Sequence, residues 1–242
     1  MRVSSRQALE RGKGVLAEQT GTDAETCYDW ADDLFVLSDL VQGSSRVALA
    51  LTDSARSLGD RVTLLDALAE KLSAVARQAV TAAISEVPSE WELATVIERL
   101  GEYAVQSGAQ VQGKAIEVAD EMFSLEQFVL SNPHVRSALS DRNRDSKYRI
   151  RLLKELVGSE LSRPAATLAA RAISAVSRDA KIEGSVSLTG TLRHMRRDLA
   201  AAGDSLVATV QVAMPLADAQ AERLRDISVS YKHLTLPTTP YV

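Results

Sequence analysis

The side chains of this chain best suited to metal binding or proton transfer are three histidines, His134, His194 and His233, and one cysteine, Cys27. A zinc site needs several imidazole or thiolate ligands at short, regular spacing, and none of these residues has such a neighbour. His134 begins a short helix, and His194 lies among arginines on a polar helix face. The sequence therefore predicts no metal site, and solvated or structural roles for His134 and His194.

Hydroxyl and carboxylate groups also lack the partners that catalysis requires. No base accompanies Ser4-Ser5, and Asp32-Asp33 fits a solvated acidic pair in the N-terminal half of a helix. The pattern G-x-x-x-x-G-K-[ST] does not occur, so the sequence offers no P-loop for a nucleotide. We therefore predict no catalytic residue, no cofactor-binding residue and no cofactor.

The most basic stretch runs through a predicted helix, where Lys147, Arg151 and Lys154 share one face. Acidic residues are interleaved and no aromatic stacking platform accompanies it, so a solvated face is expected. A net charge of -4 and a pI of about 5.5 also argue against a nucleic-acid partner. The full stretch is Arg142, Arg144, Lys147, Arg149, Arg151 and Lys154. A second group is interpreted in the same way, or as a partner surface for an acidic helix: Arg193, Arg196 and Arg197.

The composition is typical of packed helices. Of the 242 residues, 45% are hydrophobic but only 4% are aromatic, which disfavours a sheet rich in Tyr, Phe and Trp. The lone Cys27 excludes an intrachain disulfide and favours a reducing compartment. The N-terminus has no apolar core of a secretory signal, and no apolar run reaches the roughly 20 residues that cross a bilayer. We expect a soluble chain without direct membrane insertion.

The elements that position these residues occur twice. Residues 31–68 align without a gap onto 119–156 at an offset of 88, and 14 of the 38 pairs are identical. A duplicated helical unit is typical of a scaffold that presents surfaces to partners. Shared apolar positions predict shared packing, so we expect burial in both copies. In the first these are Leu34, Leu37, Val41, Leu51, Leu64, Leu65 and Leu68, and in the second Met122, Leu125, Val129, Leu139, Leu152, Leu153 and Leu156.

Apolar periodicity and capping residues define the expected helices. We predict a mainly α fold, a duplicated helical bundle with about six helices per unit, followed by a truncated small α/β domain. The helices are expected near 5–18, 23–42, 45–52, 57–71, 73–87, 89–107, 114–130, 145–157, 164–177 and 183–202, with a further short helix that starts at Asn132-Pro133. A strand at 206–213 and a short helix at 217–226 follow. The predicted domains are 1–108, 109–204 and 205–227, with a tail at 228–242.

The tail differs in style from the rest of the chain. It is rich in threonine, contains Pro237 and Pro240, and resembles translated sequencing-adapter read-through. Proline at these positions disfavours a regular helix. We therefore expect residues 228–242 to be a foreign or disordered segment that does not pack on the fold.

Three landmarks then occur in a fixed order. They are a turn and short helix at 132–140, a turn at 178–182, and a strand at 207–216 that ends in Met214-Pro215-Leu216. Together they resemble the delta subunit of the F-type ATP synthase, called oligomycin-sensitivity-conferring protein in mitochondria. The opening Ser4-Ser5-Arg6-Gln7-Ala8-Leu9 and the doubled helical region fit the long actinobacterial type. The family continues with further strands and a "GG…GD…DGS" signature that does not follow here, so the C-terminal domain is expected to be truncated.

The resemblance implies a stator role. The subunit would link the catalytic head to the peripheral stalk, so that proton-driven rotation is coupled to ATP synthesis, at the cytoplasmic face of the cell membrane. An apolar groove on the first and fifth helices of a bundle would accept the N-terminal helix of the α subunit, while the C-terminal domain would grip the b subunit. The first candidate groove is Ala8, Leu9, Val15, Leu16, Val80, Ala83 and Ile84. The duplication offers a second candidate, Leu168, Ala172 and Val176, and the sequence does not choose between them.

Two other classes of protein remain open at this point. A free-standing helical-repeat interaction module would share the duplication but not the ordered landmarks, and its captured partners would differ. An enzyme with a helical active site would need a polar constellation in a pocket, and none is evident in the sequence.

Overall fold

The computed structural model of the protein describes residues 1–21, 23–178, 187–203, 219–220 and 223. The strand predicted at 206–213, the helix at 217–226 and the tail lie almost wholly outside the described residues. The described part is mainly helical, as predicted, and its eleven helices all lie within the compact unit formed by residues 1–205.

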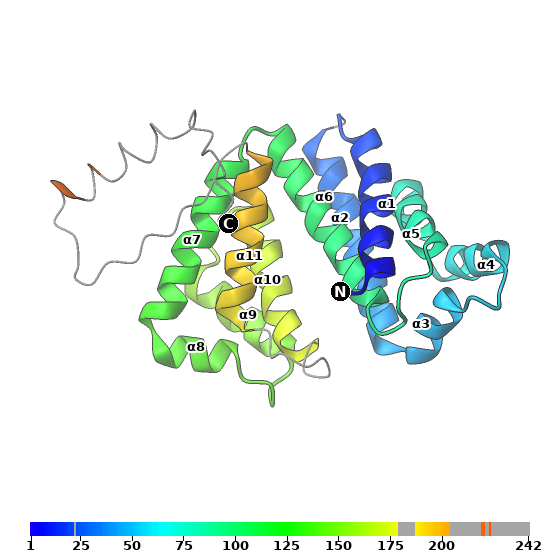
Figure 1. The fold of residues 1–242 in the computed structure, drawn as a ribbon. Helices are drawn as coiled ribbons and strands as arrows, with labels where there is room; N and C mark the ends of the chain where they lie inside the picture. The colour runs from blue at the N-terminus through cyan, green and yellow to red at the C-terminus, as the bar shows by residue number, and fades with distance from the viewer. Residues whose placement is uncertain (22, 179–186, 204–218, 221–222, 224–242) are drawn as a thin grey trace, which may run out of the picture. The chain divides into compact units, whose positions relative to one another are not determined.

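Six helices form the first copy, α1 (Val3–Gln19), α2 (Ala24–Gly43), α3 (Ser45–Thr52), α4 (Leu58–Leu68), α5 (Ala74–Ser85) and α6 (Leu93–Val111). The most extensive packing is between α2 and α6 and between α1 and α5, and α1 also packs on α6 (Figure 1). The predicted helix at 89–107 in fact begins at Leu93, because Ser89 to Glu92 form a turn after Pro88. Buried residues occur all round α6, as expected for the central helix of a bundle.

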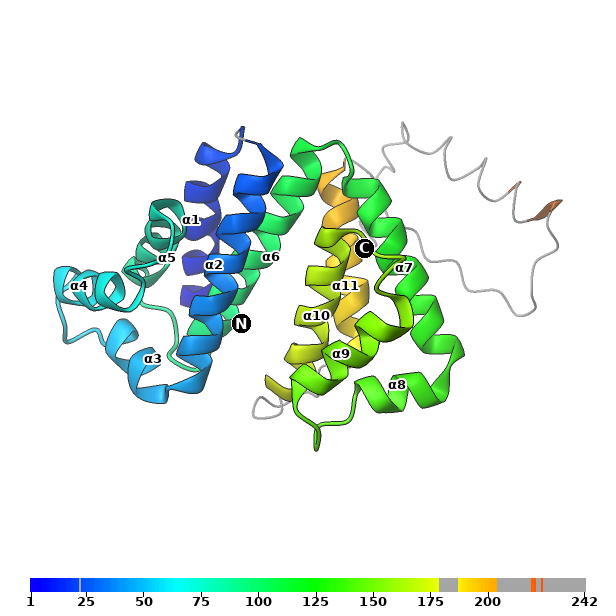
Figure 2. The ribbon, with the colours of Figure 1, turned by 180° about the vertical axis from the view of Figure 1, so that it is seen from behind.

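Five helices form the second copy within the described residues, α7 (Ala115–Ser131), α8 (Pro133–Leu139), α9 (Ser146–Val157), α10 (Arg163–Arg178) and α11 (Leu188–Ala202). α11 packs along α7, and α10 packs on α7, α9 and α11. α6 also contacts α7, α10 and α11, so it touches both copies, as Figure 2 shows from behind. The boundary predicted at residue 108 thus falls inside one continuous helix.

The helix ends follow the capping residues in the sequence. Asp23 accepts a hydrogen bond from the Thr26 N–H at 3.0 Å, and Asp145 accepts one from the Lys147 N–H at 2.9 Å. Pro133 occupies the first turn of α8, where its missing N–H costs nothing. Ser57 and Ser73 cap α4 and α5 through their side-chain oxygens. These local signals explain why most predicted boundaries agree with the structure to within one or two residues.

Equivalent side-chain contacts show that the duplication is structural. Asp33 accepts from the Ser73 N–H at 2.7 Å, and Glu121 accepts from the Ser162 N–H at 2.8 Å. The two acceptors, Asp33 and Glu121, are 88 residues apart in the sequence, whereas the two donors, Ser73 and Ser162, are 89 residues apart. The second copy therefore has one extra residue in the loop before α10. The apolar stripes keep this offset of 89. They are Ala76, Ala79, Val80, Ala83 and Ile84 in α5 and Ala165, Leu168, Ala169, Ala172 and Ile173 in α10, all buried.

The predicted core positions are largely confirmed. Ten of the 14 positions are buried, and Leu64, Leu68 and Leu152 are partly buried against the core. Leu156 is exposed, which contradicts the prediction. It lies in the last turn of α9, whose buried face is carried by Arg149 and Leu153.

Truncation of a repeated core leucine should be costly. We expect Leu65→Ala or Leu153→Ala to lower the free energy of unfolding by about 2–5 kcal/mol, because each leaves a cavity in a packed core. Urea denaturation monitored by circular dichroism measures this change. Leu156→Ala serves as the matched control and should cost less than about 1 kcal/mol. Equal losses for Leu153 and Leu156 would contradict the assigned packing.

No single helix among the described residues is long and apolar enough to span a membrane; α2 and α3 meet the length and composition criterion only as a pair, across a bend of 106°.

Candidate partner-binding surfaces

The first candidate groove lies at the seam between α1 and α5, and most of its residues are already packed in that seam. Five of them are buried in the core, namely Ala8, Leu16, Val80, Ala83 and Ile84. Leu9 and Val15 are only partly buried, so they form the solvent-accessible edge of this seam. Gly12 permits the close approach, because a Cβ there would lie 3.0 Å from the Ala79 carbonyl oxygen and 2.8 Å from Leu100. A partner would therefore meet the rim of the seam at Leu9 and Val15.

The second candidate set faces inward. Leu168, Ala172 and Val176 are buried in the core of the second copy. Val176 alone borders a hollow of about 220 Å³, which it shares with Arg136, Arg142 and the start of α11. The seam between α6 and α10 is occupied by charged groups, because Arg171 of α10 pairs there with Glu98 of α6. An apolar partner helix would therefore find no open apolar groove on these three residues.

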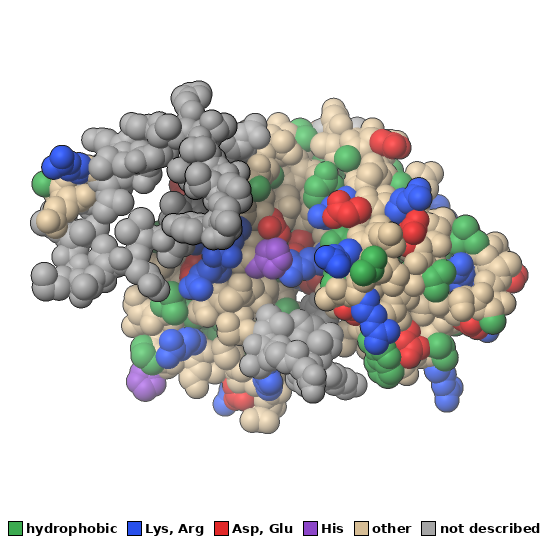
Figure 3. All heavy atoms as spheres, in the orientation of Figure 1, with side chains coloured by type: hydrophobic (Ala, Val, Ile, Leu, Met, Phe, Trp, Pro, Cys, Tyr) green, Lys and Arg blue, Asp and Glu red, His purple; other side chains and the backbone are tan. Residues whose placement is uncertain are grey.

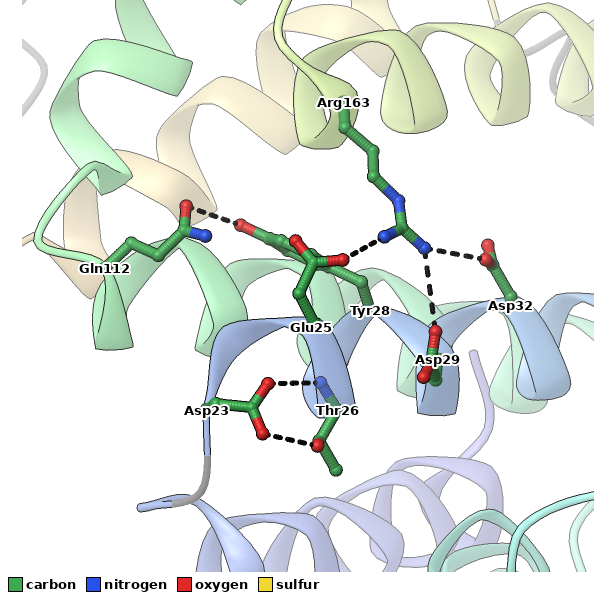
Figure 4. Close-up of polar contacts among 8 residues, drawn as sticks. All are labelled: Asp23, Glu25, Thr26, Tyr28, Asp29, Asp32, Gln112 and Arg163. Atoms are coloured by element: carbon green, nitrogen blue, oxygen red, sulfur yellow. Dashed lines mark hydrogen bonds and ion pairs between the residues drawn. The ribbon is translucent and has the colours of Figure 1, made fainter.

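Arg163, at the start of α10, joins the two copies. Its guanidinium contacts the carboxylate of Glu25 and lies 3.7 Å from Asp29 and 3.3 Å from Asp32, all on α2 (Figure 4). It also lies 5.5 Å from the centre of the Tyr28 ring. These acids are more than half exposed, so the individual pairs contribute little and act as a group.

Arg171, two turns further along α10, forms a more buried link. Its Nε donates to Glu98 of α6 at 2.7 Å, and its two terminal nitrogens donate to Asp39 of α2 at 2.9 and 2.7 Å. The guanidinium centre lies 4.7 Å from the centre of the Phe35 ring. Glu98 is almost fully buried, so loss of Arg171 would remove a hydrogen-bonded partner from a buried carboxyl group. Arg171 therefore connects α10 to both α2 and α6.

Buried polar groups continue along α6. Glu98, Glu102 and Gln106 follow at intervals of four residues, and all are buried. Arg99 donates to Glu102 at 2.7 Å. Burial nevertheless raises the pKa of Glu102 to about 7, and the attraction of Arg99 only partly opposes this effect. His194 of α11 lowers the pKa of Glu102 slightly and has its own pKa raised, chiefly by a hydrogen bond to Asp198 at 3.2 Å.

Two aromatic rings of α2 rest directly on the backbone of α6. A Cβ at Gly101 would lie 2.5 Å from the Phe35 ring, and one at Gly108 would lie 2.5 Å from the Tyr28 ring. Glycine is therefore required at both positions for the rings to lie flat. The Tyr28 hydroxyl also makes a 3.2 Å hydrogen bond with Gln112. This arrangement was not predicted from the sequence, because the helix was expected to end at residue 107, before Gly108.

An open hollow of about 560 Å³ lies beside the end of α2, α3 and the turn before α6. Trp91, which was predicted inside a helix, stands in this turn with 71% of its surface exposed. Leu49 is also exposed at the hollow. Val87, two residues before Ser89, has φ 48°, a conformation that a β-branched residue rarely adopts. The exposed tryptophan makes this hollow a third candidate surface.

The other charged residues singled out from the sequence have mixed outcomes. Lys147, Arg151 and Lys154 are exposed as predicted. Arg149 is buried, and this contradicts its place in a solvated face, because its guanidinium donates to the Leu139 and Ile173 carbonyls at 3.0 Å each. Figure 3 shows acidic and basic side chains interspersed over the first copy.

The second arginine group and the acidic pair are solvated only in part: Arg197 and Asp32 are exposed as predicted, whereas the other members are at least partly buried. Arg193 donates to the buried Glu126 at 2.9 and 2.7 Å, and Arg196 is itself buried beside that carboxylate. Asp33 accepts the hydrogen bond from the Ser73 N–H, as described above. His134 and His194 are exposed, and no group of His, Cys, Asp or Glu among the described residues could hold a metal ion; His233 lies outside them.

Comparison with known proteins gives a consistent family. Residues 102–233 match the family described as ATP synthase delta (OSCP) subunit. Over 236 residues the chain is 29% identical to ATP synthase subunit delta of Beutenbergia cavernae. This alignment covers 94% of this chain and 82% of that protein. The Streptomyces coelicolor protein of that name is 29% identical over 93% of this chain and 80% of its own length. The Corynebacterium aurimucosum protein is 30% identical over 72% of this chain and 65% of its own length.

Proposed function

Because this chain belongs to the ATP synthase delta (OSCP) subunit family and is a peripheral-stalk subunit of an F-type ATP synthase, we propose that it is the adaptor that holds the catalytic head to the stalk. Rotation of the central stalk exerts torque on the head, and that torque drives ATP synthesis only if the head is held still. The required part is a stiff body with two binding faces. The alternative of a free-standing repeat module is not favoured by these relatives.

The construction of the helical region supports this role. Close-packed helix bundles resist shear because their side chains interdigitate without voids. Here the two copies are further joined by the continuous α6 and by Arg163 and Arg171. The observation that carries the proposal is this pair of joined bundles in a chain of the delta family.

Other subunits of the ATP synthase are its partners, and we propose two in particular. The N-terminal helix of the α subunit would dock at the rim of the α1–α5 seam, where Leu9 and Val15 reach the surface. The polar seam between α6 and α10 makes the second candidate less suited to an apolar helix. The b subunit would engage the chain beyond the helical bundles, and the complex would place this subunit at the cytoplasmic face of the membrane. We also propose that the chain itself catalyses no reaction.

Calorimetry tests the first contact. The full chain is titrated with a synthetic peptide of the N-terminal helix of an actinobacterial α subunit. Apolar burial should drive binding, so the affinity should change little between low and physiological salt. We expect the double variant Leu9→Asp with Val15→Asp to weaken binding at least tenfold, because charge is placed at an apolar contact.

The matched control puts the same two charges on the exposed face of α1, as Gln7→Asp with Ala17→Asp, and should leave the affinity unchanged. If Trp91→Ser weakens binding while the α1 variant does not, the peptide occupies the hollow at α3 instead. Absence of heat and of an anisotropy change at high micromolar peptide, with a helical circular dichroism spectrum, would refute the docking of α on this region.

A further inference from the structure

An exposed apolar stripe runs along α7. Ile116, Phe123 and Leu130 recur every seven residues, so they share one face of the helix. They are 38%, 43% and 37% exposed. Single exposed apolar side chains are common on protein surfaces. A row of them at heptad spacing, however, is typical of a helix surface that packs against a second helix.

The first copy shows the equivalent face in a covered state. At the offset of 88, Ile116 corresponds to Tyr28 and Phe123 to Phe35, and both of these rings are buried. They lie between the backbone of α6 and the two arginines of α10, whose guanidinium centres stand 5.5 and 4.7 Å from the ring centres. The two positions of α2 that correspond to Ile116 and Phe123 are therefore covered by cationic side chains eight residues apart on one helix, whereas Gln42, which corresponds to Leu130, is exposed.

The helix beneath the stripe is also equivalent in part. A Cβ at Gly203 would lie 2.6 Å from Ile116, just as one at Gly108 would lie 2.5 Å from Tyr28. Where Phe35 rests on Gly101, Phe123 instead meets Arg196, whose guanidinium centre lies 4.9 Å from its ring centre. Because an arginine is bulkier than glycine, Phe123 is held further from its bundle and stays exposed.

The acids that bind the covering arginine are repeated as well. Arg163 pairs with Asp29 and Asp32 on α2, and these positions return as Glu117 and Asp120 on α7. Both repeated acids are exposed, and neither has an ion pair with any of the residues that the structure describes. The second copy has thus kept the carboxylates but presents no cation of its own to them in the described part of the chain.

We propose that the α7 stripe, Ile116, Phe123 and Leu130 with Glu117 and Asp120, docks a basic amphipathic helix of another protein chain. That helix would lay small apolar residues and two Arg or Lys side chains, about eight residues apart, on α7. An acidic helix fits less well, because Arg193 and Arg196 are already engaged by the buried Glu126. The chemistry is that of α10 on α2, supplied in trans.

The probe is a fluorescent peptide with the sequence of residues 163–178, made helical by an internal crosslink, and it is added to the full-length chain. Fluorescence anisotropy should show saturable binding that weakens as salt is raised, since the acids are exposed. Glu117→Lys with Asp120→Lys should weaken binding at least tenfold. A peptide in which Arg163 and Arg171 are both replaced by Glu should not bind.

Two control variants locate the site. Glu155→Lys with Glu160→Lys makes the same charge change on exposed positions of the second copy and should leave binding intact. Asp29→Lys with Asp32→Lys tests whether the peptide merely displaces α10 from α2. If only that variant abolishes binding, or if the unmodified chain does not bind the peptide at several hundred micromolar, the proposal is wrong. Slower hydrogen exchange across 115–131 upon binding would support it independently.

Discussion

Replacing Arg149 by alanine is expected to lower the free energy of unfolding by about 3–5 kcal/mol. The guanidinium is buried between α8, α9 and α10 and donates to the carbonyls of Leu139 and Ile173. Its removal takes this donor from the Leu139 carbonyl, at a cost of about 1–3 kcal/mol, and opens a cavity, while the Ile173 carbonyl loses its side-chain donor but stays within the helical hydrogen bonds of α10. Urea denaturation provides the measurement.

The repeat supplies the comparison for this experiment. Arg61 stands at the equivalent position and donates to the Ile84 carbonyl at 2.6 Å, so Arg61→Ala should also destabilise the chain. Arg142→Ala, on the exposed surface, should change the free energy by less than about 0.5 kcal/mol. A small effect at Arg149, equal to that at Arg142, would show that the buried guanidinium is not needed to join the three helices.

The stability of the folded chain should fall as the pH rises from 5 to 8. Burial raises the pKa of Glu102 from its ordinary 4.5 to about 7, so the folded state binds the proton more tightly than the unfolded state does. The advantage is complete below pH 4.5 and is lost as the pH rises to about 7, and it amounts to about 3 kcal/mol. His194, with its raised pKa, changes stability in the same direction: its contribution is present at low pH and lost as its imidazole deprotonates.

Urea midpoints measured at half-unit steps of pH test this dependence. Glu102→Gln keeps the size of the side chain but cannot ionise, so most of the slope between pH 5 and 8 should disappear. Glu18→Gln, exposed on α1, should leave the slope as it is. If the stability is constant or rises between pH 5 and 8, the burial of an ionisable Glu102 on α6 is contradicted.

Local patterns in the sequence were sufficient for the helices and for the duplication. Caps such as Asp23 and Asp145 act within one turn, and apolar periodicity fixes which face is buried, so both are visible without a structure. The strand and the short helix predicted after Gly203, and the domain boundaries, stay predictions. The exposed Leu156 shows the limit of periodicity at a helix end, where the neighbouring helix no longer covers the last turn.

The seam between the copies could not be predicted in the same way. Arg163 and Arg171 contact acids on α2 that are more than 130 residues away in the chain, and no local pattern selects these partners. Arg149 was grouped with exposed cations because its neighbours are basic. The repeat itself held the better signal, since Arg61 and Arg149 occupy one position among leucines in both copies. The candidate groove on α1 and α5 followed from the family resemblance, and its binding role stays a prediction.

The continuity of α6 has a mechanical consequence. Its 19 residues make a rod about 28 Å long that is built into one bundle and pressed against the other. Two bundles joined only by a flexible linker would bend at that linker under load. Here a bending load must stretch hydrogen bonds inside a helix or break the charge pairs that brace it on either side. The two bundles should therefore deflect together as a single lever, and a helix-breaking residue near the middle of α6 would convert that lever into a joint.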